Sequence, residues 1–202
     1  MSKEWQKKNF ERELPEGYVP VKIIDAKDGR TATAFTLLSL VPVVVCFIIA
    51  RACVPLASVI SSPYIWGAYG VFIGGMLLYI VLHELTHGLL YKILTGEKLT
   101  FGLTLTVAYC GVPDIYVYRR PMMAAVIAPF AVFTVVLVPC AVFAAAFDPA
   151  FFYAAMLLLG LHIGGCVGDL YDFLLLTFRY RDPRILLRDT GPKQTVFHKK
   201  DM

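Results

Sequence analysis

Two histidines and a glutamate stand close together in a stretch that is otherwise apolar, LYIVLHELTHGLLYK at residues 78–92. His83 and His87 are four residues apart, so on a helix their imidazoles point from one face and can bind the same metal ion. Glu84 follows the first histidine and can take a proton from a water that the metal holds. This spacing is typical of zinc-dependent peptide hydrolysis, because zinc lowers the pKa of its water to about 7 and polarises the carbonyl that is attacked.

A zinc site of this kind needs a third protein ligand, and the stretch GLHIGGCVGDLYD at residues 160–172 offers two candidates. His162 and Asp169 are seven residues apart, almost two helical turns, so they lie on a common face of a helix and the spacing allows either. Glycines that recur every four residues predict a close approach to another helix, which can bring Asp169 against the HELTH segment. The glycines are Gly160, Gly164 and Gly168, and Gly70, Gly74 and Gly75 form a matching region in the earlier stretch.

The composition explains why ionisable residues in these stretches are unusual. Of the 202 residues, 58% are hydrophobic, and the mean hydropathy of +0.66 is typical of integral membrane proteins. An ionisable side chain at the centre of a membrane-spanning helix costs roughly 2.5–3.5 kcal/mol on insertion, which makes it a candidate for function and argues against a chance HExxH motif. The five cysteines show no metal-ligand spacing and are interpreted as small buried hydrophobic residues.

Four apolar stretches are each long enough to cross a bilayer, which takes about 20 helical residues. They cover residues 31–50, 64–90, 121–147 and 149–178. The sequence therefore predicts an all-α integral membrane protein with four transmembrane helices. The expected organisation is a cytoplasmic N-terminal tail at residues 1–30, a four-helix catalytic domain at residues 31–178, and a basic cytoplasmic C-terminal tail at residues 179–202.

The basic residues predict the orientation of these helices. Of the 19 lysines and arginines, 18 lie in the two tails or in the segment between the second and third helices, and Arg51 alone lies on the other side. Since positive charge marks the cytoplasmic face, we expect a multi-pass protein of the cell membrane with both termini in the cytoplasm. The basic tail is interpreted as a contact with the anionic lipids of the bilayer, and no nucleic acid is expected as a partner.

The segment between the second and third helices carries a strand pattern. Apolar and polar residues alternate from Leu99 to Val107, a turn is expected at residues 110–113, and IYVY at residues 115–118 is the expected returning strand. The sequence thus predicts a β-hairpin within the loop 95–120, at the cytoplasmic boundary of the membrane. YVPVKII at residues 18–24 is a further short strand candidate, which can fold against the C-terminal tail.

Motifs are spread along the chain as LPEGY at residues 14–18, HELTHG at 83–88, APF at 128–130, HIGGCVGDLY at 162–171 and RDTG at 188–191. With them the chain resembles a small bacterial family described as putative zincin peptidases, related to the site-2 protease class of intramembrane zinc metalloproteases. The resemblance implies that His83, His87 and Asp169 bind Zn²⁺, that Glu84 is the general base, and that His162 orients the substrate or stabilises the oxyanion. Because no glycine follows Asp169, as it does in the site-2 protease signature, His162 as third ligand with Asp169 as its hydrogen-bond partner stays an alternative.

The leading hypothesis is an intramembrane zinc metalloendopeptidase that uses a zinc-activated water. Its expected partners are the lipid bilayer and a membrane protein or peptide, cleaved in a transmembrane or membrane-adjacent segment; the sequence leaves the oligomeric state open. The predicted hairpin can hold an extended substrate by strand addition. The alternatives are a membrane protein that binds metal without proteolysis and a scaffold that retains the HExxH motif.

Overall fold

The computed structural model describes residues 3–104 and 108–200. The chain divides into two compact units, each built from segments that are distant in the sequence. The first comprises Met1–Thr33, His83–Ala128 and Asp169–Met202, and the second comprises Ala34–Leu82 and Pro129–Gly168. HELTH and Asp169 belong to the first unit, whereas His162 belongs to the second.

Long apolar helices form most of the chain. The described residues include three helices that are long and apolar enough to cross a membrane: α2 (Gly29–Cys53), α4 (Ile65–Thr95) and α5 (Arg119–Phe147). The fourth predicted span is broken at Cys166 into α6 (Pro149–Gly165) and α7 (Val167–Phe178), and it counts as a span only as a bent pair. Glycines flank the break, and glycine is a poor helix former. These helices are compatible with a multi-pass membrane protein.

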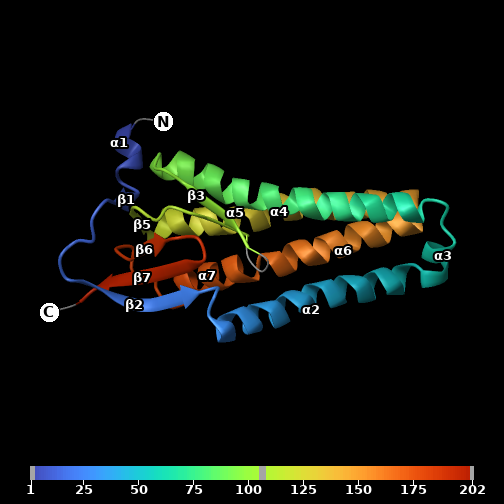
Figure 1. The fold of residues 1–202 in the computed structure, drawn as a ribbon, viewed down its shortest axis with the longest axis horizontal. Coiled ribbons are helices and arrows are strands. Elements are labelled where there is room, and N and C mark those ends of the chain that lie inside the picture. The colour runs from blue at the N-terminus through green and yellow to red at the C-terminus, as the bar shows by residue number, and fades with distance from the viewer. Residues whose placement is uncertain (1–2, 105–107, 201–202) are drawn as a thin grey trace. The chain divides into compact units, whose positions relative to one another are not determined.

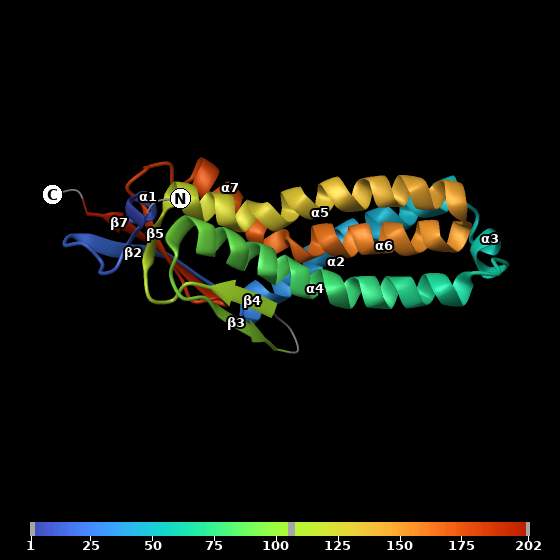
Figure 2. The ribbon, with the colours of Figure 1, turned by 90° about the horizontal axis from the view of Figure 1, so that it is seen from above.

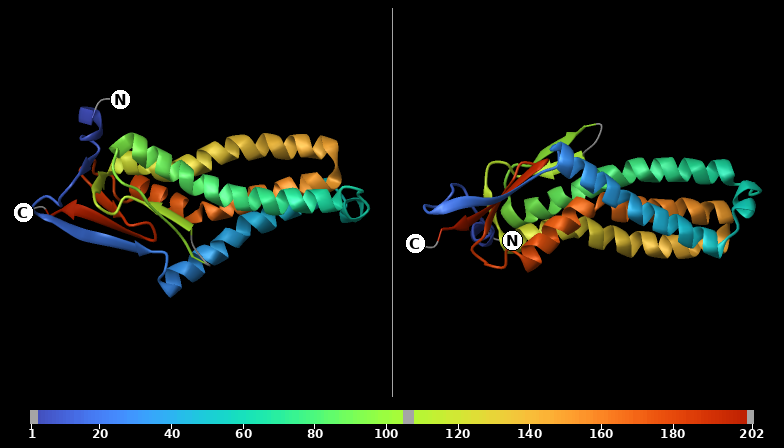
Figure 3. Two further views of the ribbon diagram at one scale, coloured as in Figure 1. Left: turned by 45° about the horizontal axis from the view of Figure 1, so that its top comes forward. Right: turned by 90° about the horizontal axis from the view of Figure 1, so that it is seen from below.

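The glycine stripe of α6 packs against a different helix from the one predicted. A Cβ added to Gly164 would lie 2.3 Å from the carbonyl oxygen of Ser39, and one on Gly160 would lie 2.8 Å from Cα of Val43. Both neighbours belong to α2, which runs beside α6 (Figures 1 and 3). Because its members are four residues apart, the stripe lies on one face of α6 and contacts a single neighbouring helix. That helix is α2, and not α4, which carries HELTH. In the region predicted to match it, Gly70 and Gly74 have no such contact within 4 Å, whereas a Cβ added to Gly75 would lie 3.2 Å from the Leu158 side chain of α6.

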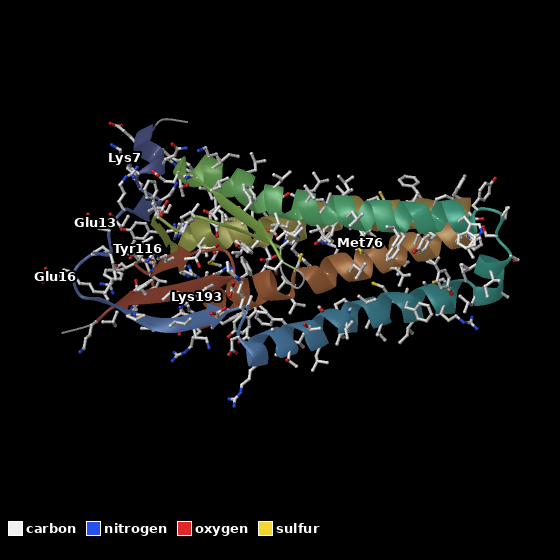
Figure 4. All side chains as sticks on the ribbon, in the orientation of Figure 1. Lys7, Glu13, Glu16, Met76, Tyr116 and Lys193 are labelled. Carbon is white, nitrogen blue, oxygen red and sulfur yellow. The ribbon has the colours of Figure 1, made fainter. Side chains whose placement is uncertain are left out.

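The first unit contains a five-stranded antiparallel sheet, so the prediction of an all-α protein is wrong. Its order is β1-β5-β6-β7-β2. The strands are β1 (Phe10–Glu11), β2 (Tyr18–Asp25), β5 (Tyr116–Tyr118), β6 (Leu186–Asp189) and β7 (Lys193–Lys199). Tyr116 and Lys193 mark β5 and β7 in Figure 4. The predicted pairing of the N-terminal strand with the C-terminal tail is confirmed, since β2 pairs with β7 along its length.

A β-hairpin lies between α4 and α5 as predicted, but its strands are residues 100–103 and 108–111, so the predicted pairing of 99–107 with 115–118 across a turn at 110–113 is wrong. Strand β3 (Thr100–Leu103) pairs antiparallel with β4 (Ala108–Gly111), and the two lie side by side in Figure 2. The expected returning strand at 115–118 instead contains β5, which joins the larger sheet. Part of the predicted strand, residues 105–107, lies outside the described residues.

The core of the first unit lies between the large sheet and the helices. Val117, Leu187 and Val196 of the sheet are buried with Met122 of α5 and Leu176 of α7. Burial of these apolar side chains is the main term that holds the sheet on the helices. The end of α4 is fixed as well, because the N-terminal segment, which begins with α1 (Lys3–Gln6), donates side-chain hydrogen bonds to its last carbonyls.

Candidate metal centre

Helix α4 places both histidines of HELTH on its buried face. His83 and His87 are both less than one-tenth exposed. Their Nε2 atoms lie 3.2 Å apart, one helical turn above each other. His87 Nδ1 lies 2.9 Å from the carbonyl oxygen of Ala125 on α5, which fixes the proton on Nδ1 and leaves the lone pair of Nε2 for a metal.

Asp169 completes a group of three ligand atoms. It lies in the first turn of α7, where a carboxylate is favoured by the helix dipole. One carboxylate oxygen is 3.2 Å from His83 Nε2 and the other is 3.4 Å from His87 Nε2. Ligands placed tetrahedrally at about 2.0–2.1 Å from zinc are roughly 3.3–3.4 Å from one another. The separation of the two imidazoles and the distance from each imidazole to its nearer carboxylate oxygen are close to this value, so the three side chains are near enough to hold one zinc ion.

The chemistry of this group also fits zinc. Oδ2 of Asp169 is buried and makes no hydrogen bond of good geometry, although His83 Nε2 is close, which is the situation expected of an atom that faces a metal. Two imidazoles and one carboxylate favour zinc over magnesium or calcium. Among the described residues, His83, His87 and Asp169 are the group of histidine, cysteine and carboxylate side chains close enough to hold an ion.

Glu84 lies beside this group without belonging to it. Its carboxylate accepts a hydrogen bond from the backbone N–H of Cys110 on β4. Cys110 does not belong to the group of described side chains close enough to hold an ion. Burial raises the pKa of its thiol to about 12, with Glu84 and Asp189 adding to the effect. The arrangement leaves Glu84 as the carboxylate next to the metal group that can accept a proton.

His162 has its own set of contacts within the second unit. It is fully buried, its Nδ1 lies 3.1 Å from the Tyr79 hydroxyl, and its Nε2 lies 3.0 Å from the Thr134 hydroxyl. The ring of Phe130 stacks on the imidazole and Phe133 meets it edge-on. Both ring nitrogens therefore have hydroxyl partners, and the catalytic role predicted for His162 stays a prediction.

Two residues near the metal group were assigned no role at the site from the sequence. Tyr91 on α4 and Asp189 on β6 are both almost fully buried, and the Tyr91 hydroxyl donates a hydrogen bond of 2.5 Å to the Asp189 carboxylate. A signal was present, because Tyr91 continues the four-residue spacing of His83 and His87 on the same helix face. Asp189 lies in RDTG, which gives no sign that it contacts α4.

Two histidines and a nearby glutamate on one helix, with an aspartate from a second helix, define a zincin-type metal centre. A sequence comparison supports the same class, since residues 76–182, more than half of the chain, match the family described as "Putative zincin peptidase". The chain belongs to this family. No match was found among curated proteins or among solved structures. Zinc is the cofactor that both the family and the site imply, and the family supports a zinc metalloprotease.

Proposed function

We propose that the protein is an intramembrane zinc metalloendopeptidase, related to the site-2 proteases, that cleaves transmembrane or membrane-adjacent segments. This proposal is supported above all by the group of His83, His87 and Asp169 and by the adjacent Glu84. Both histidines and Glu84 lie on α4, a helix long and apolar enough to cross a membrane. Ionisable residues are costly in such a helix and mark functional sites. The distribution of basic residues supports a cell-membrane location with both termini in the cytoplasm.

Each residue of the site has a distinct task in this proposal. His83, His87 and Asp169 would hold the zinc, which supplies Lewis-acid polarisation of the scissile carbonyl and a more acidic water. Glu84 accepts the proton of the attacking water and then delivers it to the leaving amine. The Cys110 N–H donates a hydrogen bond to this carboxylate and so holds it in place.

The β3–β4 hairpin is the proposed binding element for the substrate. A helical segment must be unwound before its carbonyls can be attacked, and an exposed strand can pair with the extended chain. Strand β3 lies at the edge of its two-stranded sheet, and Leu103 on it is 77% exposed. Leu103→Pro should therefore reduce cleavage and leave zinc bound, since proline removes a backbone donor from the strand. Unchanged cleavage would exclude the hairpin from substrate binding.

The decisive experiment compares the native protein with Glu84→Gln in detergent micelles. We expect zinc-dependent cleavage of labelled casein or of a mixed peptide library, lost with a chelator and restored by zinc. Because general base catalysis contributes roughly 10²–10⁴-fold, the variant should lose at least that much activity with its zinc content unchanged. Bound zinc with no cleavage by either protein would favour a metal protein without proteolysis, and absence of zinc would favour a scaffold.

A further inference from the structure

We infer that the turn at residues 189–191, between β6 and β7, positions the general base Glu84. This segment is called the Asp189 turn below. It lies outside the residues 76–182 that match the family, and the resemblance to which its RDTG motif contributes gives it no role. The inference rests on the proposed function in taking Glu84 as the base, but the contacts that carry it are independent of any substrate.

Glu84 is linked to strand β4. The backbone N–H of Cys110 donates to the Glu84 carboxylate, so the orientation of this carboxylate depends on where β4 lies. On one side β4 pairs with β3, which is an exposed strand. Strand β3 alone is a weak support, because an isolated two-stranded hairpin has only marginal stability.

The end of β4 is in contact with the Asp189 turn. The N–H of Val112, directly after β4, donates a 2.9 Å hydrogen bond to the carbonyl oxygen of Asp189. The backbones of Gly111 and Gly191 approach so closely that a Cβ on Gly111 would lie 2.4 Å from the nitrogen of Gly191. The ring of Tyr109 covers Gly191, where an added Cβ would lie 2.1 Å from a ring carbon. The turn therefore holds the end of β4 by backbone contacts that need two glycines.

The Asp189 turn is itself anchored on α4. The Asp189 carboxylate accepts one hydrogen bond from Gly191 N–H at 2.8 Å, inside the turn, and one from the Tyr91 hydroxyl at 2.5 Å. Gly191 has φ of +93°, which favours glycine. Tyr91 lies seven residues after Glu84, close to two turns along the same helix. Glu84, β4, the Asp189 turn and Tyr91 thus form a closed set of contacts that begins and ends on α4.

The consequence is that Asp189, Gly191 and Tyr91 are positioning residues for Glu84. None of them belongs to the metal group, so their loss should leave zinc bound. Their loss should instead make the backbone of β4 less stable and, through the Cys110 N–H, change the orientation of the Glu84 carboxylate. A purely structural role for the turn would lower stability without a selective effect on β4 or on the catalytic step.

The test uses the full chain in detergent, loaded with zinc. Four variants are compared with the native protein: Tyr91→Phe, Gly191→Ala, Asp189→Ala, and Asp189→Asn, which keeps an acceptor oxygen. The matched control is Asp182→Asn, a carboxylate of the same tail that bonds to Arg184 and His198. The readouts are zinc content, amide hydrogen exchange of residues 108–112 by mass spectrometry, and kcat and KM for cleavage.

We expect exchange at 108–112 to rise about tenfold or more in Asp189→Ala and Gly191→Ala, the change that follows from losing one or two hydrogen bonds. Asp189→Asn should restore part of the protection, kcat should fall with KM unchanged, and Asp182→Asn should behave as the native protein. Native exchange in Gly191→Ala and Tyr91→Phe would overturn the inference, and so would faster exchange with native kcat. If the native chain binds zinc but cleaves nothing, the proposed function fails, and the exchange data alone decide whether the Asp189 turn holds β4.

Discussion

Replacement of Asp169 by asparagine tests the metal centre most directly. Each carboxylate oxygen of Asp169 faces a different histidine, at 3.2 and 3.4 Å, and the amide removes the negative charge and turns one oxygen into a donor. Loss of a hydrogen-bond partner of a ligand already weakens metal binding by roughly 10–100-fold, so loss of the ligand itself should weaken it by at least about 100-fold. Asp172→Asn, a buried aspartate one turn further on α7, is the matched control.

Zinc-linked stability provides the assay. With free zinc buffered at about 100 times the native dissociation constant, binding should stabilise the native protein by about 2.7 kcal/mol, and a 100-fold weaker site should gain only about 0.4 kcal/mol. Unfolding of the detergent-solubilised chain, with and without zinc, measures this difference. We expect Asp172→Asn and His162→Ala to keep the full stabilisation. If His162→Ala loses it and Asp169→Asn keeps it, His162 is the third ligand and the assignment made from the geometry is wrong.

Further predictions concern stability. Tyr91→Phe removes a buried hydrogen bond to the carboxylate of Asp189 and should destabilise the fold by about 1.5–3 kcal/mol in denaturant unfolding, with a double-mutant cycle against Asp189→Asn showing non-additivity. Burial raises the pKa of Asp189 from 3.8 to about 6, so its contribution to stability is present below about pH 4 and is lost, by roughly 3 kcal/mol, as the pH rises through 6. Unfolding at pH 4 and pH 7 should show this loss in the native protein and a smaller one in Asp189→Asn. Gly164→Ala should cost about 1–3 kcal/mol because its Cβ meets the backbone of Ser39, whereas Gly70→Ala, in open space within a helix, should stabilise by about 0.5–1 kcal/mol; equal thermal shifts for the two would refute this packing argument.

The sequence predicts the long helices well because each is specified locally. A run of about 20 apolar residues can only satisfy its backbone inside a membrane as a helix, whatever its neighbours are. The HELTH pair could be predicted for the same reason, since a spacing of four on a helix fixes a common face. Predicting Asp169 as the third ligand required one more assumption, that its helix passes close to α4. The spacing of seven residues alone did not decide between Asp169 and His162 as this ligand.

The sheet could not be predicted in the same way, because its strands depend on distant partners. Strand β1 has two residues and β5 has three, too few for any alternation to be visible. Each becomes a strand only through its pairing, β1 with β5 and β5 with β6, across more than 60 residues of intervening chain in the second case. The contact of Asp189 with Tyr91 was hidden for the same reason, since the residues that fold the tail onto α4 lie far from it in the sequence.

The place of Glu84 distinguishes a catalytic centre from a purely structural one. A metal that only ties helices together needs His83, His87 and Asp169 and gains nothing from a fourth ionisable residue in a costly position. Glu84 is outside the three-residue group, yet its carboxylate has a hydrogen-bond donor, because the backbone N–H of Cys110 on β4 donates to it. A carboxylate that is held beside the ligands and is not one of them is what a general base requires. The geometry around Glu84 therefore favours peptide hydrolysis over a structural metal site, and it makes this residue, more than the three ligands, the one whose replacement separates the two.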